Sequence, residues 1–487
     1  MNTNIAKIEP VEVWSYFSEI LRIPRPSKKE ERIVNFLVEF ANKHNLPHQI
    51  DETGNVLITK PATKGMENHK TVCLQSHMDM VCEKNKDKEF DFEKDVIKAY
   101  IDGDWVKADG TTLGADDGIG IATQLAILAS NTIEHGPIEC LFTVDEETGL
   151  SGAFGLKPGF LKSTILLNLD SEDDGQIFIG CAGGRDTVVK FHFEKCTIPE
   201  DFKPVKIIVK GLKGGHSGDD INKGLGNANK ILVRILHRAT SSYSIKLATI
   251  NGGNLRNAIA REAEAVVLVK KNFINDFLKQ IDEFGLAIKN ELKTTEPDLQ
   301  IRSENTEMPE FIIDDVSQNK LINALYAAPH GVMQMSRDIP NFVETSTNLA
   351  SVKLIENYFL ITTSQRSSVA SALDDIVNMV AAVFHLIDAE VAHNDGYPGW
   401  TPNTNSEILD IAKNTYQKLF AEEPKVLAVH AGLECGLIGE KYPGMDMISY
   451  GPDIKGAHSP DERISISSTA RFWDWTLEIL KNIPKKS

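Results

Sequence analysis

The hydrophobic pattern of the first 185 residues alternates between helical and strand periodicity. Helices are predicted over 10–22, 29–44 and 118–130. Short apolar runs predict buried strands at 71–75, 138–144 and 164–169. Ser27 and Glu30 are spaced as a capping box for the second helix. This alternation predicts a three-layer α/β domain with a mostly parallel mixed sheet.

The pattern changes near residue 186, where apolar and polar positions begin to alternate strictly. Strands of an antiparallel sheet are predicted at 186–195, 205–214, 245–252, 264–270 and 359–367. Amphipathic helices are predicted over 223–239, 273–293 and 368–388. We therefore expect a separate α+β domain over residues 186–390.

The α/β pattern returns after residue 391. Apolar runs at 424–432 and 445–452 predict strands, and 466–482 predicts a final amphipathic helix. We expect one α/β domain built from the two segments 1–185 and 391–487, with the α+β domain inserted between them. A chain of 487 residues is longer than one hydrophobic core usually serves, which also favours two domains.

Composition excludes several classes of partner. The formal charge of −17 argues against nucleic acid and anionic membranes, because like charges repel. No stretch approaches the roughly eighteen uninterrupted apolar residues of a membrane helix, and the first residues lack the pattern of a secretory signal. The six cysteines have no Cys-x-x-Cys spacing. We expect a cytoplasmic protein with reduced, mostly buried thiols and neither a nucleic-acid nor a membrane partner.

Four polar clusters follow or adjoin the predicted strands of the first domain. They are His77 with Asp79; Asp116 with Asp117; Asp145, Glu146 and Glu147; and Asp170, Glu172 and Asp173. Ligands of open α/β sheets bind beyond the carboxyl ends of the strands, so we expect these side chains at one edge. Each cluster alone is more typical of a surface turn or a solvated loop.

Together, the four clusters predict a metal site. So many carboxylates repel one another in a low dielectric, and Lys and Arg are scarce within the motifs, so the counter-charge is expected from one or two divalent cations. Histidine nitrogen and carboxylate oxygen donors favour Zn²⁺ or Mn²⁺ over Ca²⁺.

The strings HMDM, LGADDG, DEETG and LDSED, in this order, resemble the M20 family of dinuclear zinc peptidases. The further strings GGHSG, GCAGG, YPGW, HAGLECG and GAHSPDE resemble a narrower group, the bacterial aminoacyl-histidine dipeptidases. The resemblance extends over essentially the whole chain. It implies a zinc-peptidase-like catalytic domain and an inserted lid domain that closes over the metals.

The resemblance also implies the metal ligands. Two divalent ions are expected, Zn²⁺ first with Mn²⁺ or Co²⁺ as substitutes. The implied ligands are His77 and Asp170 for one ion, Glu147 and His458 for the other, and Asp116 bridging both. Asp79 would orient His77 from behind. A cis peptide bond between Asp116 and Asp117 is implied as well.

The implied activity is hydrolysis of unblocked dipeptides, Xaa-His and β-alanyl-histidine among them, by a metal-activated water. Glu146 would be the general base and His216 the donor to the oxyanion. The implied substrate contacts are Arg366 with the carboxylate, Asn257 with the backbone and Glu434 with the ammonium. An exposed strand arginine and a turn asparagine are the structural alternatives for the first two.

Other functions stay open at this point. The M20 family also includes tripeptidases, carboxypeptidases and N-acyl amino acid deacylases, and a metal-binding scaffold without catalysis is a further alternative. The presence of Glu146 counts against the scaffold, because a scaffold has no use for a base beside its ligands. The sequence also leaves open a homodimer.

Overall fold

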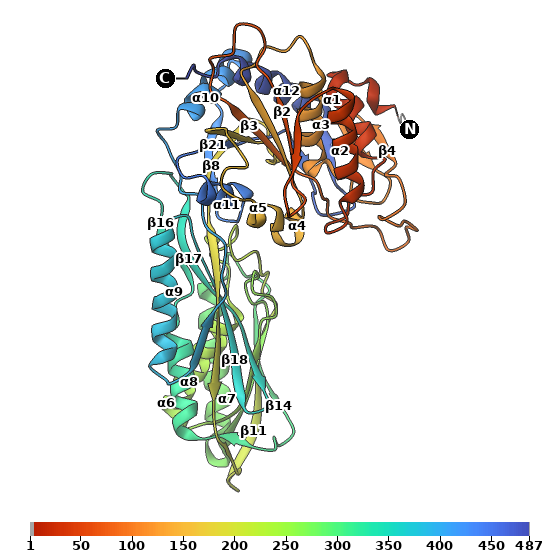
Figure 1. Ribbon diagram of the computed structural model, residues 1–487. Coiled ribbons are helices and arrows are strands. Elements are labelled where there is room, and N and C mark those ends of the chain that lie inside the picture. Colours follow the sequence, from red (N-terminus) through yellow and green to blue (C-terminus); the bar gives the residue numbers. More distant parts are fainter. Residues whose placement is uncertain (1–3, 487) are drawn as a thin grey trace. The chain divides into compact units, whose positions relative to one another are not determined.

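The computed structural model describes residues 4–486 and divides into two compact units (Figure 1). The first unit contains the chain up to Gly180, Pro402–Ala428 and the chain from Leu433 onward. The second unit contains Cys181–Thr401 and Val429–Gly432. The predicted insertion 186–390 lies wholly within Cys181–Thr401. The short return of the chain at Val429–Gly432 had no signal in the sequence.

The first unit is built on an eight-stranded sheet. In spatial order its strands are β1 (His48–Ile50), β2 (Val56–Lys60), β6 (Ile138–Thr143), β3 (Val72–His77), β7 (Ile165–Asn168), β21 (Asp446–Ser449), β8 (Gln176–Cys181) and β20 (Lys425–Val429). The four central strands β6, β3, β7 and β21 are parallel, whereas the pairs β1–β2, β2–β6 and β21–β8 are antiparallel. Every residue of β3, β6 and β7 is buried, so both faces of the sheet are covered and the unit has three layers.

Helices and a small sheet complete this unit. The helices are η1 (Ile5–Lys7), α1 (Val11–Ile20), α2 (Glu31–Lys43), α3 (Ala115–Ala129), α4 (Glu146–Gly149), α5 (Ser151–Gly155), α10 (Glu407–Phe420), α11 (Glu434–Lys441) and α12 (Ile466–Lys481). The small sheet has the order β22 (Ile454–Lys455), β23 (Arg463–Ser465), β5 (Trp105–Ala108) and β4 (Ala99–Asp102). Of the elements predicted here, α1, α2, α3 and α12 lie where helical periodicity placed them.

The predicted capping box of α2 is wrong. Glu30 is the N-cap residue, but its side chain makes no cap hydrogen bond. The Ser27 hydroxyl instead donates to Oδ2 of Asp79 (2.8 Å). Glu30 Oε1 accepts from the backbone N–H groups of Lys28 (2.9 Å) and Asp145 (3.0 Å). Both side chains tie this turn to distant segments, which local spacing does not reveal.

The second unit is an antiparallel nine-stranded sheet with helices on one face. Its strands follow the order β14 (Gln300–Asn305), β11 (Phe202–Lys210), β13 (Ala263–Lys270), β12 (Lys246–Gly252), β17 (Val343–Ile355), β18 (Tyr358–Ser367), β9 (Gly183–His192) and β19 (Glu390–His393), and β16 (Gly331–Met335) pairs with β17. The helices are α6 (Ala228–Tyr243), η2 (Lys271–Phe273), α7 (Ile274–Glu291), α8 (Asp315–Ala327) and α9 (Ala370–His385). One hydrophobic core joins α6, α7, α8 and α9 to the sheet (Figure 1). A short ribbon of β10 (Lys195–Cys196) and β15 (Ile312–Ile313) lies beside it.

Sequence periodicity predicted five strands (β9, β11, β12, β13 and β18) and three helices (α6, α7 and α9) of this unit, but not all of their ends. The helix predicted over 223–239 begins at Ala228, because the Asn227 side chain accepts from the backbone N–H of Lys230 (3.2 Å) and caps it there. The long strand β17 and the helix α8 had not been predicted. Within residues 4–486, no helix is long and apolar enough to cross a lipid bilayer. All six cysteines are thiols, and four of them are buried.

Candidate metal centre

The candidate ligands lie at the carboxyl edge of the eight-stranded sheet. His77 is the last residue of β3, Glu147 lies in the short helix α4 after β6, and Asp170 follows β7. Because β3, β6 and β7 run parallel, these three side chains reach the same edge. Asp116 lies in the first turn of α3, and His458 lies in the loop between β22 and β23. The Asp116–Asp117 peptide bond is cis, as the family resemblance implied.

Asp116 lies between two histidines. Its Oδ1 atom is 3.0 Å from Nε2 of His77, which is also 3.3 Å from Oδ1 of Asp170. Its Oδ2 atom is 3.2 Å from Nε2 of His458, which is 3.1 Å from Oε2 of Glu147. The five predicted ligands therefore form two three-residue groups that share Asp116, and the donor atoms within each group lie within 4.8 Å of one another.

The donor set of both groups fits divalent metal ions. Each group offers one imidazole nitrogen and two carboxylates, the combination that Zn²⁺ and Mn²⁺ accept. Oε1 of Glu147 is buried and has no hydrogen-bond partner among the described residues. A buried carboxylate oxygen without a partner is costly unless a cation compensates it. A third group, His77 with Glu146 and Glu147, places Glu146 beside the same ligands.

The crowded carboxylates shift one another's pKa values. Burial raises the pKa of Asp170 to about 7, and the charge of Asp116 adds to the shift. Burial likewise raises the pKa of Glu146 well above the usual range, with a further contribution from Asp170. Burial also acts to raise the pKa of Asp116, but hydrogen bonds from His458 and His77 outweigh it and hold that pKa far below normal. Bound cations would keep all three groups charged.

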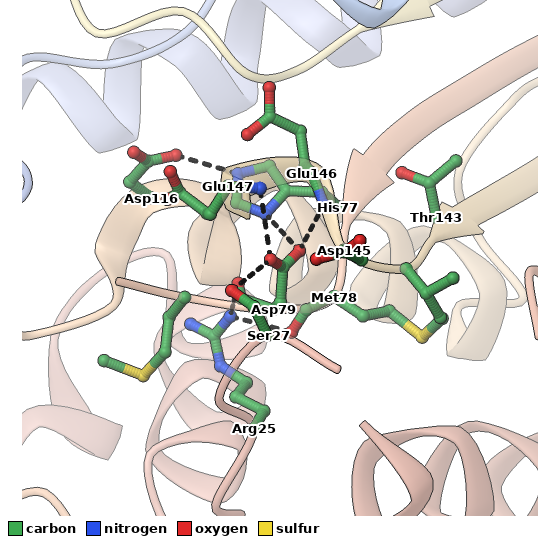
Figure 2. Close-up of polar contacts among 12 residues, drawn as sticks. Arg25, Ser27, His77, Met78, Asp79, Asp116, Thr143, Asp145, Glu146 and Glu147 are labelled. Carbon is green, nitrogen blue, oxygen red and sulfur yellow. Dashed lines mark hydrogen bonds and ion pairs between the residues drawn. The ribbon is translucent and has the colours of Figure 1, made fainter. Parts of the chain in front are cut away.

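Asp79 anchors two segments of the site at once (Figure 2). Its Oδ1 atom lies 3.3 Å from Nδ1 of His77 and accepts from the backbone N–H of Glu146 (3.0 Å). Its Oδ2 atom accepts from the N–H of Glu147 (3.2 Å) and from the Ser27 hydroxyl. Burial acts to raise the pKa of Asp79, but His77 and these donors lower it to about 2. The family resemblance implied only the contact with His77. The hydrogen bonds from the backbone N–H groups of Glu146 and Glu147 were not predicted.

Arg25 is a buried positive charge that sequence reasoning missed. Arg25 is 2% exposed, and its guanidinium donates to the carbonyls of Met78 (2.9 Å) and Asp79 (Figure 2). It also donates to the carbonyl of Gly114. Gly114 has φ 69°, and a Cβ there would lie 2.6 Å from Nη2 of Arg25, so this position requires glycine. Lys and Arg are scarce within the motifs, and Arg25 therefore supplies part of the missing positive charge from another segment. Arg25 lies in a basic stretch of a kind that is typical of an exposed surface, so nothing in the sequence indicated that it is buried.

Glu434 is buried in a polar network below the edge. Its side chain is 1% exposed, and Oε2 accepts from Nε2 of Gln75 (2.6 Å) and from the Thr143 hydroxyl (2.8 Å). Oε1 has no partner among the described residues, and burial raises the pKa of this carboxyl to about 7. None of the carboxylate is open to solvent in this structure, so its contact with a substrate ammonium stays a prediction.

The second unit brings His216 and Arg366 together. Arg366 lies on β18, is 7% exposed and donates from Nη1 to the Tyr397 hydroxyl (2.8 Å). Its Nη2 atom lies 3.5 Å from Nε2 of His216, whose Nδ1 atom is 3.1 Å from Oδ2 of Asp219. Arg366 is therefore buried and fixed, unlike the exposed strand arginine that was the alternative. Tyr397 had been noted only within the string YPGW, and its contact with Arg366 was not predicted.

Asn257 lies in the loop between β12 and β13. Its carbonyl accepts from the N–H of Ser217 (2.8 Å), and the adjacent Ala258 forms a backbone bridge with His216. The loop of Asn257 and the turn of His216 are thus joined, although the Asn257 side chain is exposed. These backbone contacts agree equally well with the structural alternative, in which Asn257 is a turn residue.

Comparisons with known proteins agree over the whole chain. The model of peptidase family M20/M25/M40 matches residues 73–482. The chain is 43% identical over 484 residues to the cytosol non-specific dipeptidase of Escherichia coli (strain K12), which covers 99% of this chain and 100% of that protein. The crystal structure of aminoacylhistidine dipeptidase from Vibrio alginolyticus superposes with a TM-score of 0.95 at 43% identity, covering 99% of both chains. A tripeptidase from Staphylococcus aureus shares the fold, with a TM-score of 0.57 at 18% identity over 98% of this chain and 99% of that one.

Proposed function

Because the chain belongs to peptidase family M20/M25/M40, we propose that it is a metal-dependent dipeptidase that hydrolyses unblocked dipeptides, Xaa-His among them. Both full-length relatives at 43% identity carry dipeptidase names. The observation that carries the proposal is the position of Asp116, with one carboxylate oxygen toward His77 and the other toward His458. Such a carboxylate is suited to bridge two cations.

Two divalent ions fit this arrangement. His77, Asp116 and Asp170 would hold one ion, and Asp116, Glu147 and His458 would hold the other. When bound, the ions supply Lewis-acid polarisation of the scissile carbonyl and a water whose pKa lies near neutrality. We propose Zn²⁺ as the ion, with Mn²⁺ or Co²⁺ as substitutes, because imidazole and carboxylate donors suit all three.

Glu146 is the general base of this proposal. It takes a proton from the attacking water and returns that proton to the amine nitrogen of the leaving amino acid. Glu146 suits this role because it lies beside His77 and Glu147, and because bound cations would keep its carboxylate charged and able to accept a proton. Asp79 fixes the Glu146 backbone through the N–H group, and so sets the direction of the side chain.

Arg366, His216 and Asn257 of the second unit and Glu434 of the first unit supply the proposed contacts with the substrate. Arg366 receives the carboxylate, because Tyr397 fixes its guanidinium and its Nε atom is buried without a partner among the described residues. His216 serves the oxyanion of the tetrahedral intermediate, since the backbone N–H groups of Gly218 (3.3 Å) and Asp219 (3.2 Å) donate to Nδ1, so that the ring proton lies on Nε2, which can donate. We assign Asn257 to the substrate backbone and Glu434 to its ammonium.

A substrate panel tests the proposal. Protein stripped with a chelator and reloaded with Zn²⁺, Mn²⁺ or Co²⁺ is assayed with free Xaa-His dipeptides, their N-acetylated forms and tripeptides. Free dipeptides are expected to be hydrolysed fastest, and the stripped protein is expected to be inactive. Faster turnover of acylated amino acids or tripeptides would assign another M20 activity. Two bound ions without hydrolysis of any substrate would favour the scaffold.

The name of one relative supports a proposal for the cellular setting. The Escherichia coli protein is named a cytosol dipeptidase, and we propose the cytosol for this chain as well. Its partner is then the dipeptide substrate, and a homodimer stays an open alternative to a monomer.

A further inference from the structure

Glu462 binds the turn that carries Asp116. Its side chain is 2% exposed, and its two carboxylate oxygens accept from four consecutive backbone N–H groups. The donors to Oε2 are Leu113 (2.6 Å) and Gly114 (2.9 Å), and the donors to Oε1 are Ala115 (2.7 Å) and Asp116 (3.3 Å). These groups lie at the start of α3, where the backbone has no helical partners. One carboxylate therefore fixes the whole turn.

The same short segment carries His458. The Ser459 hydroxyl donates to the carbonyl of Gly456 (2.7 Å), and the N–H of Glu462 donates to the carbonyl of Ser459 (3.1 Å). Directly after Glu462, strand β23 pairs with β5. The segment 456–462 is thus a compact turn that is fixed at one end by a sheet and on its side by the Glu462 carboxylate.

We propose that Glu462 is a positioning residue for the ion held by Asp116, Glu147 and His458. Its carboxylate joins the turn 113–116 to the segment that carries His458, so ligands from remote parts of the chain meet before an ion binds. The inference rests on the proposed function in one respect, because it takes these three residues to be metal ligands. It adds a specific support for one of the two ions.

The contacts of Arg25 explain why loss of Glu462 is expected to weaken the binding of one ion more than that of the other. Arg25 donates to the carbonyl of Gly114 and to those of Met78 and Asp79, so it joins the same turn to the segment after His77. Without Glu462, the turn keeps this attachment to the His77 group and loses its attachment to the His458 segment. The ion at His458 is therefore expected to be weakened selectively.

The variant Glu462→Gln tests this with little change in size. An amide keeps one acceptor oxygen and turns an NH₂ group toward backbone N–H donors, which leaves two of them without an acceptor. Loss of a group that supports a metal ligand typically costs about 10–100-fold in metal affinity. Calorimetric titration of the metal-stripped protein with Zn²⁺ or Mn²⁺ is expected to show two ions in the wild type. The variant is expected to bind one ion normally and the other about 10–100-fold more weakly.

Glu139→Gln is the matched control. Glu139 is 3% exposed, and its carboxylate accepts from the N–H groups of Lys162 (3.0 Å) and Ser163 (2.9 Å) in the same unit. It lies near the start of β6, whereas the metal ligands lie beyond the ends of the strands. Its replacement disturbs backbone hydrogen bonds of the same kind, to two N–H groups instead of four, and both ions are expected to bind as in the wild type.

Activity supplies a second readout that a general loss of structure would not mimic. In Glu462→Gln, kcat is expected to return toward the wild-type value as metal is raised, while KM for the dipeptide stays unchanged. The milder Glu462→Asp keeps the charge on a side chain one methylene shorter, and a smaller loss of affinity is expected. Circular dichroism shows whether each variant is folded.

Four results would overturn the proposal: two ions bound with wild-type affinity in a folded Glu462 variant, equal weakening of both ions, the same loss in Glu139→Gln, or failure of both Glu462 variants to fold in excess metal. The last result would mean that Glu462 supports the fold as a whole. A wild-type protein that binds no ion would refute the proposed function instead.

Discussion

Oδ2 of Asp116 lies 3.2 Å from Nε2 of His458, a residue 342 positions further along the chain. The other carboxylate oxygen of Asp116 lies 3.0 Å from Nε2 of His77. A single side chain thus joins candidate ligands from the first and the last of the three chain segments of the first unit. Asp170 and Glu147, by contrast, each belong to a single histidine–Asp116 pair.

Replacing Asp116 is expected to affect both ions. Asp116→Ala removes a ligand from each group, whereas Asp170→Ala removes one ligand from the His77 group only. After dialysis against metal-free buffer, Asp116→Ala is expected to retain less than one ion per chain, because each of the two groups has lost a donor. Asp170→Ala is expected to retain about one ion, because only the His77 group has lost a donor. Elemental analysis measures both. Asp314→Ala, which removes the N-cap of α8, is the control and is expected to retain two ions.

Glu146→Gln is expected to bind both ions and to lose hydrolysis. The amide has the shape of the carboxyl but accepts no proton from water, and a positioned general base contributes about 10²–10⁴-fold to a rate. A fall of that size in kcat, at unchanged metal content, is the expected result. Dipeptide turnover and elemental analysis measure the two quantities. Turnover at the wild-type rate would remove Glu146 from the mechanism.

Arg366→Lys is expected to raise KM for free dipeptides. Lysine keeps the charge but loses the paired donors that suit a carboxylate, and a charge-assisted hydrogen bond is worth about 1.5–3 kcal/mol, or roughly 10–100-fold. Tyr397→Phe removes the hydroxyl that fixes the guanidinium and is expected to raise KM less. With dipeptide amides as substrates, the difference between Arg366→Lys and the wild type should vanish. If it persists, the carboxylate is not what Arg366 binds.

The buried His430 is expected to make the protein sensitive to acid. Burial lowers the pKa of His430 to about 3, and Arg366 adds to the shift. Its Nε2 atom lies 2.7 Å from the Ser346 hydroxyl, and the residue is only 6% exposed, so a charged ring would be poorly solvated there. The unfolded chain binds that proton at its ordinary pKa near 6.5, whereas the folded chain resists it. The contribution is therefore complete above pH 6.5 and is lost as the pH falls toward 3.

As the pH falls from 7.5 to 5, the titration of His430 is expected to lower the unfolding free energy by about 2 kcal/mol. Denaturant unfolding at both values measures the loss, and His430→Gln is expected to lose about 2 kcal/mol less than the wild type, because its side chain does not titrate. The exposed His385→Gln is the control and is expected to follow the wild type. Equal losses in all three proteins would contradict the assignment.

Periodicity predicted the parts of the fold that bury a regular face. Strands β3, β6 and β7 contain short apolar runs because both of their faces are covered, and α12 shows a clear apolar stripe. Three of the candidate ligands, His77, Glu147 and Asp170, could be named from the sequence because they end or follow such strands, and all five because their order resembles a family pattern. Asp116 illustrates this: Asp-Asp-Gly alone is typical of a turn, and only the other motifs along the chain make Asp116 a candidate ligand.

Other features depend on contacts between remote segments. Ser27 and Glu30 have the spacing of a helix cap, but Asp79 and the backbone of Asp145 bind them instead. Arg25 lies in a basic stretch that is typical of an exposed surface, yet it is buried among backbone carbonyls. No local pattern distinguishes a charged side chain that stays in water from one that finds partners on another segment.

The sequence by itself determined which residues could form the site: the apolar runs fix the sheet, and the acidic and histidine side chains after them fix the kinds of atom at its edge. Only the tertiary structure decided how those atoms are held. The contacts of Glu462, Arg25 and Asp79 are made to backbone groups, which nearly every residue possesses. The types of the residues they bind therefore do not predict these contacts. The physical reason is that backbone hydrogen bonds depend on where the chain passes in space, whereas periodicity reports only which side chains avoid water.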